Sequence, residues 1–218
     1  MPFTILECTD SDMPRAFELL SIAFGHEHPY VESVFPAHET PEGRRTGGER
    51  LLGWRKGDPL AINMKAVDDA TGKMIGHAKW IIPRGVVPPE FALGGEYWES
   101  GEEKEYAAWI FGQYLMPRRK VFKESGGNVV SLDLMTIDPD YQRQGVGRAL
   151  LRWGTDLADE LGVDAIVEAT DYGRGLYASE GFEVQYKWVT PMPGKWEGRE
   201  AQSFWWMIRP KSGKETKC

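Results

Sequence analysis

Cysteine is scarce in this sequence, where Cys8 and Cys218 are the only two among 218 residues. They stand far apart, and no CxxC spacing occurs. Such a chain lacks the cysteines for a disulfide framework or a cysteine-based zinc site. We therefore expect no bound metal and a reducing compartment.

Long apolar runs and basic runs are also missing. No apolar stretch of about 18 residues occurs, and the opening segment, 1–7, lacks the basic region and apolar run of a leader peptide. We expect a soluble cytoplasmic protein, monomer or homodimer, with no membrane partner. Asp and Glu outnumber Lys and Arg by 33 to 26, a formal net charge of −7 that argues against nucleic acid as a partner. An acidic surface attracts cationic small molecules or basic peptides instead.

What the sequence contains predicts one α/β domain over residues 1–218. The length and a 41% share of hydrophobic residues suffice for a sizeable core. Runs rich in Val, Ile and aromatic residues predict strands, and apolar residues at helical spacing predict helices. We expect strands at 3–8, 60–68, 74–82, 128–137, 163–169, 182–190 and 203–209, and helices at 13–24, 146–161 and 172–179.

Two segments are expected to depart from this regular alternation. Residues 25–48 are rich in Pro, Gly and polar residues, which predicts a long loop with at most a short helix. Residues 101–125 are charged with interspersed aromatics, which predicts a helical insertion broken near Pro117. Long ordered loops often carry function.

The segment 142–148, QRQGVGR, lies between a predicted buried strand and an amphipathic helix. Gly145 and Gly147 let the backbone approach a ligand, and the first helical turn offers unpaired N–H groups at the positive end of the helix dipole. Arg143 and Arg148 can add charge-assisted contacts to phosphate oxygens. This arrangement favours a pyrophosphate site. The alternative is an ordinary strand-to-helix turn with arginines facing solvent.

Two motifs resemble one family. Residues 137–151, IDPDYQRQGVGRALL, resemble the acetyl-CoA-binding motif of GNAT acyltransferases, and residues 176–182, LYASEGF, resemble that family's signature at a helix-to-strand junction. The resemblance implies an α/β acyl-CoA N-acyltransferase fold, with a twisted and mostly antiparallel sheet flanked by helices. It is specific over 128–185, the implied CoA-binding core, and looser elsewhere, where the chain is similar to fungal GNAT-domain proteins.

The resemblance also implies roles for single residues. Backbone groups of Met135, Thr136 and Ile137 would bind the pantetheine arm on a strand that splays from its neighbour. Tyr177 would donate a proton to the thioester sulfur. Thr170 stands where the family usually has an Asn that contacts CoA. The residues implied for the pyrophosphate are Arg143, Gln144, Gly145, Val146, Gly147 and Arg148.

The general base and the acceptor pocket are less defined. Asp133 and Glu168 are our candidates for the base, and each could equally be a surface partner of Arg or Lys. Residues 26–28, His-Glu-His, could orient or deprotonate an amine, or could be solvated loop residues. His38 and His77 are expected to be structural. Tryptophans that could wall an acceptor cleft or fill the core are Trp98, Trp109, Trp188, Trp196, Trp205 and Trp206.

The sequence thus predicts an N-acetyltransferase that uses acetyl-CoA as cosubstrate and a primary amine of a small molecule or amino acid as acceptor. An open groove would instead favour a peptide or protein N-terminal acetyltransferase. A non-catalytic acyl-CoA-binding module is the third possibility, although Tyr177 speaks against it.

Overall fold

A seven-stranded sheet organises the computed structural model, which describes residues 1–211; Cys218 lies outside the described residues. The strand order is β1-β2-β3-β4-β5-β7-β6, and every neighbouring pair is antiparallel except the parallel pair β4 and β5. The strands are β1 (Phe3–Glu7), β2 (Ala61–Asp68), β3 (Met74–Ile81), β4 (Val129–Ile137), β5 (Asp164–Ala169), β6 (Glu183–Val189) and β7 (Ser203–Arg209). The expected mixed, mostly antiparallel sheet is confirmed.

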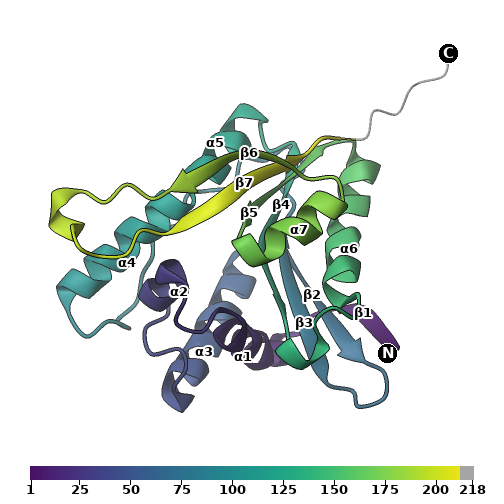
Figure 1. The fold of residues 1–218 in the computed structure, drawn as a ribbon, viewed down its shortest axis with the longest axis horizontal. Helices are drawn as coiled ribbons and strands as arrows, with labels where there is room; N and C mark the ends of the chain where they lie inside the picture. The colour runs from purple at the N-terminus through teal and green to yellow at the C-terminus, as the bar shows by residue number, and fades with distance from the viewer. Residues whose placement is uncertain (212–218) are drawn as a thin grey trace.

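Helices cover both faces of this sheet (Figure 1). Helices α6 and α7 lie on one face; α1, α2 and α3 lie on the other, where α5 also packs. The α-helices are α1 (Met13–Phe24), α2 (Pro29–Val34), α3 (Pro41–Gly57), α4 (Gly101–Tyr114), α5 (Met116–Glu124), α6 (Val146–Leu161) and α7 (Asp171–Ser179). Short 3-10 helices lie at η1 (Asp10–Asp12), η2 (Pro139–Tyr141) and η3 (Gly194–Trp196). No helix within 1–211 has the length and hydrophobicity to cross a bilayer.

The helix that follows the glycine-containing turn, α6, forms the larger core with the sheet. Its apolar stripe, which includes the fully buried Leu150 and Leu151, packs on strands β2 to β5. Gly154 lets the helix lie directly against the indole of Trp80, because any side chain there would overlap that ring. The helix ends at Gly162, whose φ of 68° gives the left-handed C-cap that glycine adopts without strain.

The expectation of a long loop over residues 25–48, interrupted by a short helix, is right for α2 but wrong for residues 41–48, which form the first half of α3. Helix α3 begins with a cap at Thr40, whose hydroxyl accepts a hydrogen bond from Gly43 N at 3.0 Å, followed by Pro41 in the first turn. Gly47 lies against the ring of Phe17 in α1, where a methyl group would overlap it. These glycines permit close helix packing and do not mark a loop.

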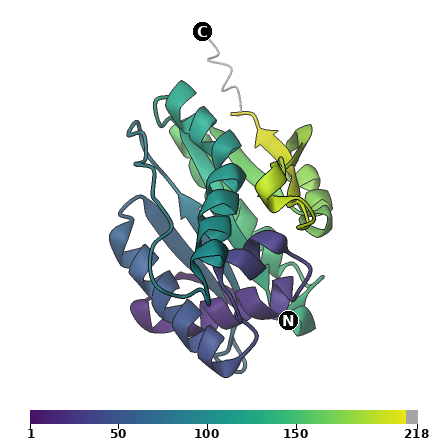
Figure 2. The same ribbon diagram turned by 90° about the vertical axis from the view of Figure 1, so that its left-hand side faces the viewer.

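The segment 101–125 is helical as expected. It forms α4 and α5, which are separated by one residue, Leu115. The loop between β6 and β7 folds back onto α4 (Figure 2). Its Trp196 is buried against Tyr106 and Trp109, and its Arg199 pairs with Glu103 of α4 at 2.5 Å. Most of this anchoring comes from the buried indole, because exposed ion pairs contribute little.

Candidate active site

Strands β4 and β5 separate in the middle of the sheet. Their parallel pairing covers only Val129–Leu132 against Asp164–Val167, so Asp133 to Ile137 have no partner in β5. The expected splay is confirmed by this register. A cavity of about 1060 Å³ opens at the separation and extends between α1, α2 and α7. Backbone groups of 133–137 on the β5 side are therefore available to a ligand lying along the strand.

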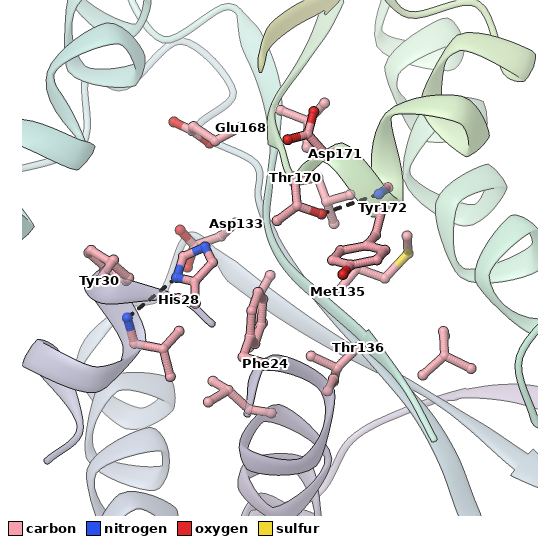
Figure 3. A pocket seen from close by; sticks show the side chains of 18 of the residues that line it. Phe24, His28, Tyr30, Asp133, Met135, Thr136, Glu168, Thr170, Asp171 and Tyr172 are labelled. Carbon is pink, nitrogen blue, oxygen red and sulfur yellow. Dashed lines mark hydrogen bonds between the residues drawn. The ribbon is translucent and has the colours of Figure 1, made fainter. Parts of the chain in front are cut away.

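A β-bulge lies at the point of separation. Leu132 pairs with Trp80 and Leu134 pairs with Lys79, which leaves Asp133 without a partner in β3. A bulge bends the strand and redirects the extra residue. Asp133 lines the cavity beside Glu168 (Figure 3).

The cavity extends from the strand split to the turn before α6, which forms one of its ends. Gly145 caps the helix with φ at 91°, a conformation that favours glycine, and a Cβ on Gly147 would lie 3.2 Å from the Leu176 side chain, so space there is tight. Gly145 and Gly147 line the cavity with Arg143 and Arg148. Four N–H groups of the first turn of α6 have no helical partner, as in other anion sites at helix N-termini.

The two arginines of this turn differ in their surroundings. Arg143 has a left-handed backbone with φ at 61°, and within residues 1–211 its guanidinium has neither an ion pair nor a hydrogen bond. Arg148 is held by Glu180, with Nε 2.8 Å from Oε1. Arg143 is therefore free to meet a phosphate, whereas Arg148 must share or leave a carboxylate.

Gln144 and Val146 were also predicted to bind the pyrophosphate, but neither side chain lines the cavity. Gln144 donates from Nε2 to the carbonyl oxygen of Asp140 at 3.1 Å, and Val146 is buried in the core. Only their backbone groups could serve a ligand.

Helix α7 places Thr170 and Tyr177 on the same cavity. The Thr170 hydroxyl caps α7 by accepting from Gly173 N at 3.2 Å, and its own proton remains free to donate. Tyr177 is 7% exposed and lines the cavity. Burial, with a smaller contribution from Glu168, raises the pKa of Tyr177 above its usual value, so the hydroxyl keeps its proton at neutral pH.

Asp133 and Glu168 belong to one buried ion-pair cluster. The guanidinium of Arg118, from α5, donates to both oxygens of Glu168, through Nε at 3.0 Å and through Nη2, and to Asp133 Oδ1 through Nη1. Lys79 Nζ lies 2.8 Å from Asp133 Oδ2. Two cations thus neutralise two carboxylates.

The two carboxylates respond differently to this cluster. Burial acts to raise the pKa of Asp133, but the attraction of Lys79 and Arg118 outweighs it and holds that pKa well below its usual range. For Glu168, burial outweighs the opposing attraction of Arg118 and raises the pKa. Glu168 is therefore the stronger proton acceptor of the two candidates.

The inner wall of the cavity is aromatic. Tyr30 of α2 stacks on Tyr114 of α4 with ring centroids 4.3 Å apart, and Phe24 at the end of α1 lies edge-on to His28 at 4.7 Å. Trp54 of α3 completes this wall. Sequence patterns predicted none of these contacts, because the residues come from four separate elements, and α2 and the beginning of α3 lie in a segment that was expected to be mainly loop.

His28 lines the cavity, whereas His26 lies at the surface. His28 caps α2, where its Nδ1 is 3.4 Å from Val31 N, and burial lowers its pKa to about 4, so the ring is neutral. His26 pairs with Glu32 and Glu39 at the surface. Glu27 lines the cavity mouth and accepts from the hydroxyl of Tyr172 at 3.3 Å.

The remaining histidines and tryptophans lie away from the cavity. His38 and His77 are buried and hydrogen-bonded, as expected of structural residues. None of the six tryptophans considered for the acceptor cleft lines the cavity. Five pack in or against hydrophobic clusters, and Trp98, before α4, donates from Nε1 to the carbonyl oxygen of Ser33 at 2.7 Å. Among residues 1–211, no group of three His, Cys, Asp or Glu side chains is arranged to hold a metal ion.

The strand split at a bulge, followed by a glycine turn and a helix N-terminus, is the arrangement that the resemblance to GNAT acyltransferases implies, and comparison with known proteins shows the family. Residues 111–184 match the acetyltransferase (GNAT) domain family. An acetyltransferase of the fungus Stachybotrys chartarum is 38% identical over 207 residues, which is 90% of this chain and 88% of that protein. The chain belongs to the GNAT acetyltransferases.

Solved structures share the fold. A mosquito arylalkylamine N-acetyltransferase like 5b has a TM-score of 0.64 at 17% identity, covering 95% of this chain and 99% of the other. A phosphinothricin acetyltransferase from Sinorhizobium meliloti, solved with acetyl-CoA, has a TM-score of 0.56 at 18% identity, covering 97% and 90%. At these identities the likeness establishes the fold and not the acceptor.

Proposed function

We propose that this protein transfers the acetyl group of acetyl-CoA to the primary amine of a small molecule. The observation that carries the proposal is one continuous cavity, which joins the glycine turn before α6 to the aromatic wall and passes Tyr177 and the strand split. Acetyl-CoA would lie along Met135–Ile137 with its pyrophosphate at the turn, and Thr170 could donate to the pantetheine arm. When bound, it supplies the activated acetyl group.

The residues of the cavity suit the proton movements of this reaction. The acceptor nitrogen must be neutral before its lone pair can form the C–N bond, and Glu168, with its raised pKa, would take up the proton. As the C–S bond breaks, the sulfur leaves with the electron pair and takes the proton of the Tyr177 hydroxyl. A backbone N–H freed by the strand split would stabilise the oxyanion that forms between these events.

A small acceptor is favoured over a peptide because the loop between β6 and β7 covers part of the cavity. The loop between β6 and β7 reaches α2, where Gln202 Oε1 accepts from Tyr30 N at 3.0 Å, and it is anchored to α4 through Trp196. An extended peptide needs an open groove with free edges on both sides. The same cover argues against a protein N-terminus as the acceptor.

The test is release of the CoA thiol from acetyl-CoA in the presence of candidate acceptors. We expect turnover with a small primary amine and little with short peptides that have free N-termini. The matched control is Tyr177→Phe, which keeps the ring but removes the hydroxyl. Turnover with peptides alone would show that the proposed function is wrong, and acetyl-CoA binding without turnover of any acceptor would favour the non-catalytic module.

A further inference from the structure

The inner half of the cavity offers an acceptor mainly apolar surface. Phe24, Tyr30, Trp54 and Tyr114 line it together with Leu134 of β4. These four aromatic residues are only partly buried and line the cavity, so each contributes apolar surface to it. A ligand that fills this half must remove apolar surface from water, which favours an apolar or aromatic body.

The cations in this half are already paired. Lys79, which lines this half, is bound to Asp133 at 2.8 Å. Arg118 is buried, does not line the cavity, and is bound to both Asp133 and Glu168. Within the described chain the other lysine and arginine side chains that line the cavity are Arg143 and Arg148, at the opposite, pyrophosphate end. A carboxylate on the acceptor would therefore be buried without a partner, which is strongly unfavourable.

The mouth of the cavity adds a negative field. Glu27 from the α1–α2 loop, Asp171 at the start of α7 and Glu200 from the β6–β7 loop line it and are exposed. Carboxylates at a cavity mouth raise the local concentration of cations and lower that of anions. An incoming alkylammonium is attracted, whereas a zwitterionic amino acid gains nothing and its carboxylate is repelled.

We propose that the acceptor is a monoamine with an aromatic or branched apolar body and no carboxylate. The ammonium group is drawn to the acidic mouth, and the apolar body lies against Phe24 and the Tyr30–Tyr114 pair. Polyamines fit less well, because a second charged group would either enter the apolar half or leave it unfilled. This inference rests on the proposed acetylation of small amines and narrows the class of acceptor.

The first test compares acceptors that differ in one group. Phenylalanine and phenylalaninamide share a side chain and an α-amine and differ by the carboxylate; 2-phenylethylamine lacks both. We expect kcat/KM for phenylalaninamide and 2-phenylethylamine to exceed that for phenylalanine by at least about tenfold, and 2-phenylethylamine to exceed putrescine and spermidine.

The second test uses a pair of variants in α1. Phe24→Ala removes a ring from the cavity wall, whereas Ile22→Ala changes an exposed residue, 39% accessible, two positions earlier. We expect Phe24→Ala to raise KM for 2-phenylethylamine about tenfold and to leave the thermal shift caused by CoA unchanged, and Ile22→Ala to alter neither.

The outcomes separate the two proposals. Preferred turnover of spermidine, putrescine or phenylalanine would overturn the inference while small-amine acetylation stands. An unchanged KM in Phe24→Ala would likewise overturn it. Turnover of peptides alone would overturn both.

Discussion

Removing the Arg143 guanidinium is expected to weaken CoA binding about tenfold, whereas removing that of Arg148 should weaken it only about threefold. A hydrogen bond to a charged group contributes about 1.5–3 kcal/mol, and the exposure of Arg143 places it at the lower end. Arg148 must give up or share Glu180, 2.8 Å away, so its net contribution is the difference between two similar contacts.

Two further variants sharpen this comparison. Arg143→Gly removes the same guanidinium but relieves a left-handed backbone that costs an L-residue about 1 kcal/mol. We expect it to lose as much CoA affinity as Arg143→Ala without melting at a lower temperature. Glu180→Gln removes the competitor of Arg148 and should strengthen binding a few-fold.

Calorimetry of CoA binding at low and high ionic strength measures these differences. Both arginine effects should shrink at high salt because the contacts are exposed and screened. The reasoning fails if Arg148→Ala costs more affinity than Arg143→Ala at low salt, since the ion pair with Glu180 would then not compete with phosphate.

Three other predictions use different residues. Gly147→Asp should abolish the rise in melting temperature caused by acetyl-CoA, since it places a side chain 3.2 Å from Leu176 and a negative charge at the pyrophosphate turn; a shift equal to that of the wild type would contradict the site. Tyr177→Phe should lower turnover by about a hundredfold or more with CoA affinity nearly intact, and full turnover would remove Tyr177 as the acid. The pKa of His28 is lowered from 6.5 to about 4, so the unfolded state binds its proton first and stability is lost as pH falls between these values. His28→Asn keeps a capping side chain without the titration, and its urea midpoint should fall less between pH 6.5 and 5 than that of the wild type; equal falls would refute this.

The grouping of the residues that we expect to bind CoA could be predicted from the sequence because it is local. Gly145, Gly147 and Tyr177 lie in two short motifs, which predict a turn and a helix. The strand at 128–137 leads directly into the first of these motifs. The cavity contains these residues together with the predicted Met135, Thr136, Ile137 and Thr170. Short contiguous motifs of this kind can be recognised from the sequence alone.

The acceptor side could not be predicted, because its residues meet only after folding. Arg118 and Glu168 are 50 positions apart, and Tyr30 and Tyr114 lie on different helices. Tryptophan count was also misleading: the indoles stabilise the core, and the tryptophan that lines the cavity is Trp54, in a segment whose beginning was expected to be loop. In that segment, Gly47 allows close packing against Phe17 and does not mark a turn.

The segment 101–125 reads as an insertion, yet the chain cannot be shortened by deleting it. Arg118 is the only bridge within residues 1–211 that contacts both Glu168 and Asp133, and it comes from this segment. Without it, Glu168 would be a buried carboxylate with no counter-charge, which costs several kcal/mol. The cavity therefore depends on an arginine from the inserted segment. A minimal protein built from the expected CoA-binding core alone, 128–185, would retain the pyrophosphate turn but would not form a working cavity.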